Sequence, residues 1–207
     1  MVLIKNYIKE NEKADAFLKN GMDLQPETFY KFLEQYEELE KSGGSKFSER
    51  VFAGWLETLL GEKAVLEPHK KIESVIPNVY KNYDFLVSLG SLKIIIELKC
   101  NIDMIEKDIF KFVITPSSPS AEIIKILLVW EKWDNSKARN GDLSSYMKIA
   151  NHAKEKGWIN AFFYLRGYDR KSMCECTEKS MCECTELKKE INDMKEYIKK
   201  LTTASTG

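Results

Sequence analysis

Two apolar segments joined by a glycine–serine pair place the strongest constraint on how this chain can fold. The segments are 83–89 (YDFLVSL) and 91–99 (SLKIIIELK), and both are rich in the aromatic and β-branched residues that favour strands. Gly90-Ser91 suits a two-residue type II′ turn, because glycine readily adopts the positive φ that the first turn position requires. The sequence therefore predicts an antiparallel hairpin with a fixed register.

This register brings acidic residues of the two strands face to face. Asp84 lies six residues before Gly90, and Glu97 lies six residues after Ser91, so the turn places them opposite each other. Because strand side chains alternate between faces, Lys99 projects to the same side as Glu97. Facing carboxylates about 5 Å apart would repel by roughly 3 kcal/mol at an effective dielectric of about 20. A divalent cation would offset this cost, and oxygen-only ligands favour magnesium or manganese over zinc.

The rest of the chain alternates between helical and strand patterns. Segment 42–46 should separate two helices, with Pro26 in the first turn of one and Ser48 capping the other. Helices are expected over 2–20, from Pro26 to about Leu39, from Ser48 to about Leu60, over 102–113 and over 143–153, and further strands over 64–76, 124–130 and 159–165. Crossovers through helices imply parallel pairing, so we expect an α/β fold with a mixed β-sheet flanked by helices.

The length of 207 residues fits one ordinary core with appendages. We place the core at 42–170, preceded by an N-terminal helical segment at 1–41 and followed by a tail at 171–207. The N-terminus lacks the apolar run of a signal peptide, and no stretch of about 18 apolar residues occurs. A cytoplasmic protein is therefore expected.

One glutamate of the helix before the first strand is a further candidate. Residues three, four and seven beyond Glu49 are Phe52, Ala53 and Leu56, so the carboxylate lies on or beside the apolar face. A half-buried charge there needs a partner. The structural alternative is a first-turn acid that the helix dipole favours.

The paired acids and the following lysine resemble the signature of the PD-(D/E)XK nuclease superfamily. Its pattern is an acidic residue on one strand and E-x-K on the next, here Asp84 and Glu97-Leu98-Lys99. Tyr83 stands where the family name has proline, a variable position with no chemical role. The order of helices and strands is also similar to the restriction endonuclease-like core of that family.

This resemblance implies metal-dependent hydrolysis of DNA phosphodiester bonds. Among such enzymes, the compact size and the lack of a helicase or ATPase motif favour a type II restriction endonuclease acting as a homodimer. Asp84 and Glu97 would hold Mg²⁺, for which Mn²⁺ could substitute, helped by the carbonyl of Leu98 and by Glu49. Lys99 would orient the attacking water, and the metal would acidify that water and neutralise charge on the phosphate. Two alternatives stay open: a structure-specific resolvase or repair nuclease of the same fold, and a non-catalytic DNA-binding or assembly protein.

Lys and Arg together number 32, and so do Asp and Glu, so the chain has no net charge to attract DNA. Any surface that binds DNA must therefore be a local group of basic residues. Basic and polar side chains after the glycine pair 43–44 and on the strand over 64–76 could contact the DNA backbone, and a loop after a later strand could read base edges. Ordinary solvated lysines and a plain surface loop are the structural alternatives. The candidates are Ser45, Lys46, Arg50, Lys70, Lys71, Asn135, Lys137 and Arg139.

The tail begins with a duplicated eight-residue word, 171–178 repeated as 179–186. Its four cysteines could bind a structural zinc, although the duplication explains them without a metal; they are Cys174, Cys176, Cys182 and Cys184. The following residues have coiled-coil spacing, which predicts either a helix packed on its own domain or a seam between partners. The residues of this seam are Leu187, Ile191, Met194, Ile198 and Leu201.

Overall fold

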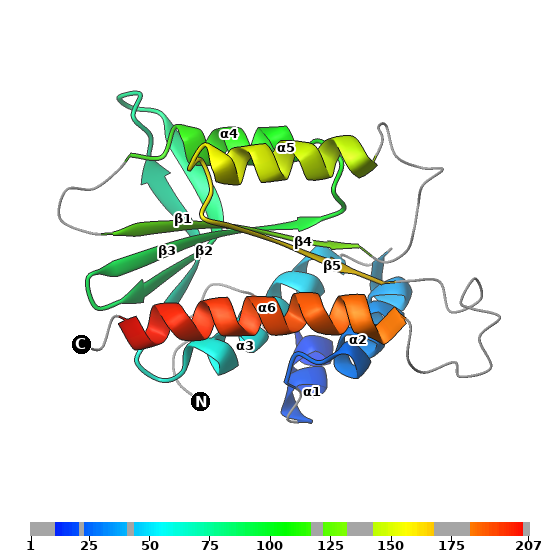
Figure 1. The fold of residues 1–207 in the computed structure, drawn as a ribbon. Coiled ribbons are helices and arrows are strands. Elements are labelled where there is room, and N and C mark those ends of the chain that lie inside the picture. The colour runs from blue at the N-terminus through cyan, green and yellow to red at the C-terminus, as the bar shows by residue number, and fades with distance from the viewer. Residues whose placement is uncertain are drawn as a thin grey trace.

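A five-stranded sheet separates two layers of helices in the computed structural model (Figure 1). The structure describes residues 11–20, 23–40, 44–116, 122–131, 143–167 and 183–204, except for the side chains of 183–185 and 204. The elements in chain order are α1 (Glu12–Lys19), α2 (Pro26–Leu39), α3 (Gly44–Leu60), β1 (Val65–Glu73), β2 (Tyr80–Leu89), β3 (Leu92–Cys100), α4 (Ile105–Val113), β4 (Ile123–Glu131), α5 (Leu143–Glu155), β5 (Ala161–Arg166) and α6 (Glu183–Ala204).

The sheet has the order β1-β2-β3-β4-β5 and is mixed, as expected from the sequence. β1, β2 and β3 pair antiparallel, whereas β4 and β5 join them in parallel through α4 and α5. The predicted hairpin register is confirmed, because the pairs of β2 and β3 run from Leu89↔Leu92 to Phe85↔Ile96. Gly90 has a φ of 60°, a conformation that glycine adopts without steric cost.

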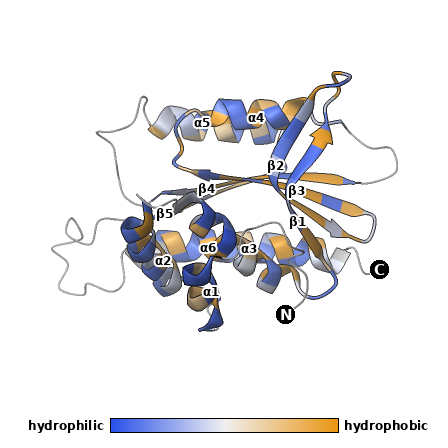
Figure 2. Ribbon diagram, turned by 180° about the vertical axis from the view of Figure 1, so that it is seen from behind, coloured by the Kyte–Doolittle hydropathy of each residue, from blue (hydrophilic) through white to orange (hydrophobic). Residues whose placement is uncertain are grey.

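Each face of the sheet carries its own apolar core. Ile94 and Ile96 belong to the core beneath α1, α2, α3 and α6, and Ile95 belongs to the core beneath α4 and α5. This alternation explains why three consecutive isoleucines can all be buried in one strand. Figure 2 shows apolar residues along the central strands, between the two helical layers.

An aromatic cluster fixes α2 and α3 against β4. The ring of Phe32 lies 5.5 Å from that of Trp55 and 5.0 Å from that of Trp130, both edge to face. Phe47 of α3 also stacks on Phe32, with ring centroids 5.7 Å apart. Such aromatic contacts add to the free energy of area burial, so the position of α3 along the sheet is firmly set.

The C-terminal helix α6 packs on its own domain. Leu187, Ile191, Met194 and Ile198 are each at most 2% exposed and belong to the core beneath α3. A carboxylate oxygen of Glu190 also accepts the backbone N–H of Tyr164 at 2.9 Å, on the edge strand β5. The spacing that also suits a coiled coil therefore serves intramolecular packing here. The four tail cysteines lie outside the described side chains.

Three predicted helix starts are wrong. α4 begins at Ile105 rather than at residue 102, because Met104 before it is in the left-handed conformation. A helix does not run unbroken through 2–20, because Asn11 is extended and its side chain accepts the N–H of Ala14 at 3.1 Å, which starts α1 at Glu12. α3 begins at Gly44 rather than after Ser48. A Cβ on Gly44 would lie 2.8 Å from the ring of Tyr36, so glycine permits a close helix contact there. Ser48 is buried inside the helix and donates to the carbonyl of Ser45.

Among the described residues, no helix is both long enough and apolar enough to cross a membrane.

Candidate functional site

Asp84 and Glu97 come together where β2 and β3 extend past their last regular pair, Phe85↔Ile96. Oδ2 of Asp84 accepts the backbone N–H of Leu98 at 2.7 Å. This bond fixes Asp84 beside Glu97, which is only 5% exposed. The structure therefore brings together the two acids that the hairpin register paired.

Burial and neighbouring negative charge disfavour the ionised form of both carboxylates. Burial, followed by the charge of Asp84, raises the pKa of Glu97 to about 8 against the opposing effect of Lys111. Burial also raises the pKa of Asp84, although the N–H of Leu98 and the charges of Lys111 and His69 act against it. A cation bound between these groups would favour the ionised form of both.

Two residues of α4 complete this arrangement. The ammonium of Lys111 contacts Oε1 of Glu97 and lies 3.4 Å from Oδ1 of Asp108. Lys99 projects to the same side of β3 as Glu97, as predicted, and its Nζ lies 2.9 Å from Oδ2 of Asp108. Sequence reasoning missed both α4 residues. A signal for Asp108 existed, because it lies on the same helix face as the apolar Ile105, which precedes it by three residues.

α4 is held in place by its apolar face and by Tyr83. Ile105, Ile109 and Phe112 are buried against the sheet. The hydroxyl of Tyr83 donates to the carbonyl of Lys111 at 2.8 Å and also bonds to Thr115. The residue before Asp84 therefore has a structural task, which is to tie the end of α4 to β2.

Glu49 approaches the pair from the other helical layer. Its Oε2 lies 3.2 Å from Nε2 of His69. Burial raises the pKa of Glu49, His69 lowers it, and the charge of Asp84 raises it again. His69 was not expected here. The pairs Pro68↔Phe85 and Lys70↔Tyr83 place it beside Asp84 on the neighbouring strand.

The donor atoms fit a hard divalent cation better than zinc. In the described part of the chain, no three His, Cys, Asp or Glu side chains form a ready metal cage. Magnesium, however, commonly uses one or two protein carboxylates and completes its shell with water and phosphate oxygens. Oε2 of Glu97 is buried and has no hydrogen-bond partner. A buried, unsatisfied carboxylate oxygen beside a second carboxylate is a suitable ligand for such an ion.

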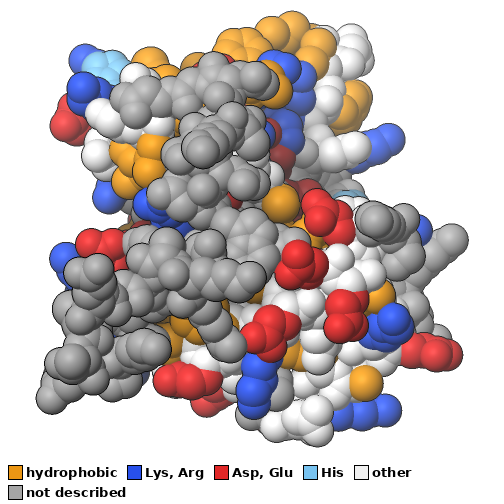
Figure 3. Space-filling model, turned by 90° about the vertical axis from the view of Figure 1, so that its right-hand side faces the viewer, with side chains coloured by type: hydrophobic (Ala, Val, Ile, Leu, Met, Phe, Trp, Pro, Cys, Tyr) orange, Lys and Arg blue, Asp and Glu red, His pale blue; other side chains and the backbone are white. Residues whose placement is uncertain are grey.

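The residues predicted to contact DNA do not share one environment. Arg50 forms an ion pair with Asp15 at 2.7 Å, and Lys70 pairs with Glu67 at 2.8 Å. Ser45 and Lys46 are exposed in the first turn of α3, and Lys71 is exposed on β1. Asn135, Lys137 and Arg139 lie outside the described residues. In Figure 3, acidic and basic side chains are interspersed among the coloured residues of one side of the molecule.

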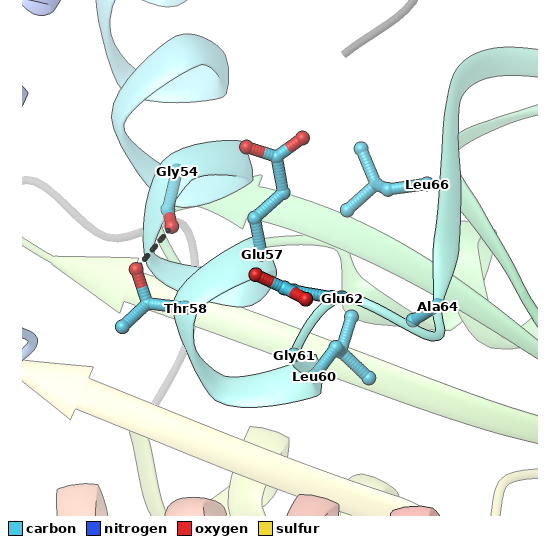
Figure 4. Close-up of a pocket in the computed structure, with 8 residues that line it drawn as sticks. All are labelled: Gly54, Glu57, Thr58, Leu60, Gly61, Glu62, Ala64 and Leu66. Atoms are coloured by element: carbon cyan, nitrogen blue, oxygen red, sulfur yellow. Dashed lines mark hydrogen bonds between the residues drawn. The ribbon is translucent and has the colours of Figure 1, made fainter. Parts of the chain in front are cut away.

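A separate cavity of about 320 Å³ lies where α3 turns into β1 (Figure 4). Its polar side chains are Glu57, Thr58 and Glu62, and Leu60 and Leu66 form its apolar wall. The hydroxyl of Thr58 is occupied by the carbonyl of Gly54. These groups offer no pairing of acid and base comparable with that around Glu97.

Comparison of the chain with known protein families, with curated proteins and with solved structures finds no match.

The raised pKa of Glu97 predicts a pH dependence of stability. The folded protein keeps a proton on Glu97 up to about pH 8, whereas the ordinary value is 4.5. The folded state therefore binds more protons between these values, and without metal its free energy of unfolding should fall as pH rises through this range. Urea unfolding in EDTA at pH 5 and pH 8 measures the change. In Glu97→Gln, the free energy of unfolding should fall less between these two pH values. An equal fall in both proteins would show that Glu97 does not carry the raised pKa.

Proposed function

We propose that this chain is a magnesium-dependent endonuclease that hydrolyses DNA phosphodiester bonds. The observation that carries the proposal is the carboxylate pair of half-buried Asp84 and buried Glu97, set on adjacent strands with Lys99 on the same side. We further propose that the sheet and its helices form a restriction endonuclease-like core. Two features support this proposal: the sheet mixes antiparallel and parallel strand pairs, and helix α3 precedes β1.

In this proposal, Asp84 and Glu97 would hold the metal, with Glu49 and the carbonyl of Leu98 as further oxygen donors. When bound, the metal would acidify a water molecule and neutralise charge that develops on the phosphate. The protein contributes a fixed pair of acids, because Asp84 is anchored to the backbone of β3. Lys99 contributes positive charge near the attacking water.

The preferred substrate is double-stranded DNA with a specific recognition site, cut by a homodimer. A small domain suits a two-fold assembly that cuts both strands. A resolvase or repair nuclease of the same fold is the second candidate, since the same acids would serve either substrate. A non-catalytic DNA-binding protein is the third. A non-catalytic protein is disfavoured by the cost of holding the half-buried Asp84 beside the buried Glu97 without a bound cation.

A substrate panel tests this choice. The wild-type protein is incubated with magnesium and with phage DNA, a palindrome-containing duplex or a branched junction. We expect discrete fragments from phage DNA, because site recognition restricts cleavage to few positions. Cleavage of the junction alone would replace the restriction proposal with the resolvase proposal. Binding of all three without cleavage would favour the non-catalytic protein.

A further inference from the structure

The charged residues around Glu97 form a connected chain of contacts that reaches beyond the E-x-K motif. Lys111 contacts Glu97 and approaches Asp108, and Asp108 in turn pairs with Lys99. Both α4 side chains are well covered, with exposed fractions of 12% for Asp108 and 30% for Lys111. Each motif residue that projects toward α4 therefore has a partner of opposite charge on that helix.

We propose that Asp108 and Lys111 are positioning residues of the active site. Lys111 sets the orientation of the Glu97 carboxylate, and Asp108 sets the position of the Lys99 ammonium. This inference rests on the proposed nuclease function and adds α4 to its machinery.

The two oxygens of Glu97 are used differently, which supports the role of Lys111. Oε1 is occupied by the ammonium of Lys111, whereas Oε2 is buried and has no hydrogen-bond partner. A carboxylate held by one oxygen presents the other in a defined direction. Lys111 thereby leaves Oε2 available to an incoming cation and limits rotation of the group.

Asp108 orients the side chain of Lys99, as Lys111 orients that of Glu97. A lysine side chain has several rotatable bonds and loses considerable entropy when its ammonium is fixed. The 2.9 Å contact with Asp108 selects one arrangement of Lys99 before substrate arrives. Asp108 is itself fixed, because α4 is docked through Ile105 and Ile109 and tied to Tyr83 at its end.

Rate measurements distinguish positioning from a merely structural role. Lys111→Met and Asp108→Asn should each lower kcat for DNA cleavage by about a hundredfold, the cost of a misplaced reacting group, with KM little changed. Lys111→Arg keeps the charge and should recover part of kcat. Lys107→Met, an exposed change on the same helix, is the matched control and should cleave like the wild type.

Stability without metal gives a second readout that does not depend on activity. Lys111→Met should lower the midpoint of thermal unfolding in EDTA at pH 9, where Glu97 is ionised, in the wild-type background. It should lower it less in the Glu97→Gln background, because the ion pair is already absent there. Equal losses in both backgrounds would show that Lys111 does not act on Glu97 and would overturn its role.

Three outcomes of the rate measurements overturn the inference. If Lys111→Met and Asp108→Asn cleave like the wild type while Asp84→Asn is inactive, positioning by α4 fails and the nuclease proposal stands. If KM rises and kcat is unchanged, these residues act in DNA binding instead. If the wild type cleaves no DNA under any condition, both proposals fail together.

Discussion

Replacing Glu97 with glutamine should abolish DNA cleavage while leaving the fold intact. Glutamine keeps the shape of the side chain but cannot carry the charge that binds a divalent cation. A bound metal contributes several kcal/mol to transition-state stabilisation, so the rate should fall by at least about a thousandfold. The fold should survive, because Lys111 keeps Asp108 as a neighbour at 3.4 Å.

The matched control for this change is Glu106→Gln. Glu106 is exposed on α4, so the same chemical substitution there removes a charge near the site without touching a proposed ligand. Single-turnover cleavage with saturating magnesium measures the rate for each variant, and circular dichroism verifies their helix content. Cleavage by Glu97→Gln at the rate of the control would exclude Glu97 as a metal ligand.

Placing an aspartate at position 191 should unfold the domain or bring it close to unfolding. Ile191 is 0% exposed in the core between α6 and the sheet. The substitution removes a buried apolar side chain and introduces an unpaired charge, and together these cost at least about 4 kcal/mol. Whole domains have stabilities of about 5–15 kcal/mol, so the loss is a large fraction of the total.

Asn192→Asp adds the same charge one residue later, at an exposed position of α6, and should change stability little. Urea unfolding compares both variants with the wild type, and sedimentation reports their mass. A normal unfolding midpoint for Ile191→Asp together with a halved mass would mean that α6 joins partners instead of completing its own core.

The sheet could be predicted largely because one turn determines its central pairing. A two-residue turn at Gly90 permits a single register, so the opposition of Asp84 and Glu97 followed from counting residues. Crossovers through helices then placed β4 and β5 parallel to β3. These features depend on local rules of turn and strand geometry, which a single sequence carries.

The remainder of the site depends on contacts that no local rule specifies. The connection between Glu73 and Tyr80 is too long to set a register, so His69 could not be placed beside Asp84 in advance. Lys111 reaches Glu97 only because of the rotation at which α4 docks on the sheet. The start of α3 was misplaced for a related reason, since Gly44 is helical through its close contact with Tyr36.

The central claim is that Asp84 and Glu97 bind a metal that hydrolyses DNA. Its most direct test is incubation of supercoiled plasmid and of a branched junction with the wild type and with Asp84→Asn, in magnesium and in EDTA. We expect cleavage of at least one substrate by the wild type in magnesium alone. Equal cleavage by Asp84→Asn, cleavage that persists in EDTA, or no cleavage of either substrate by the wild type would contradict the claim.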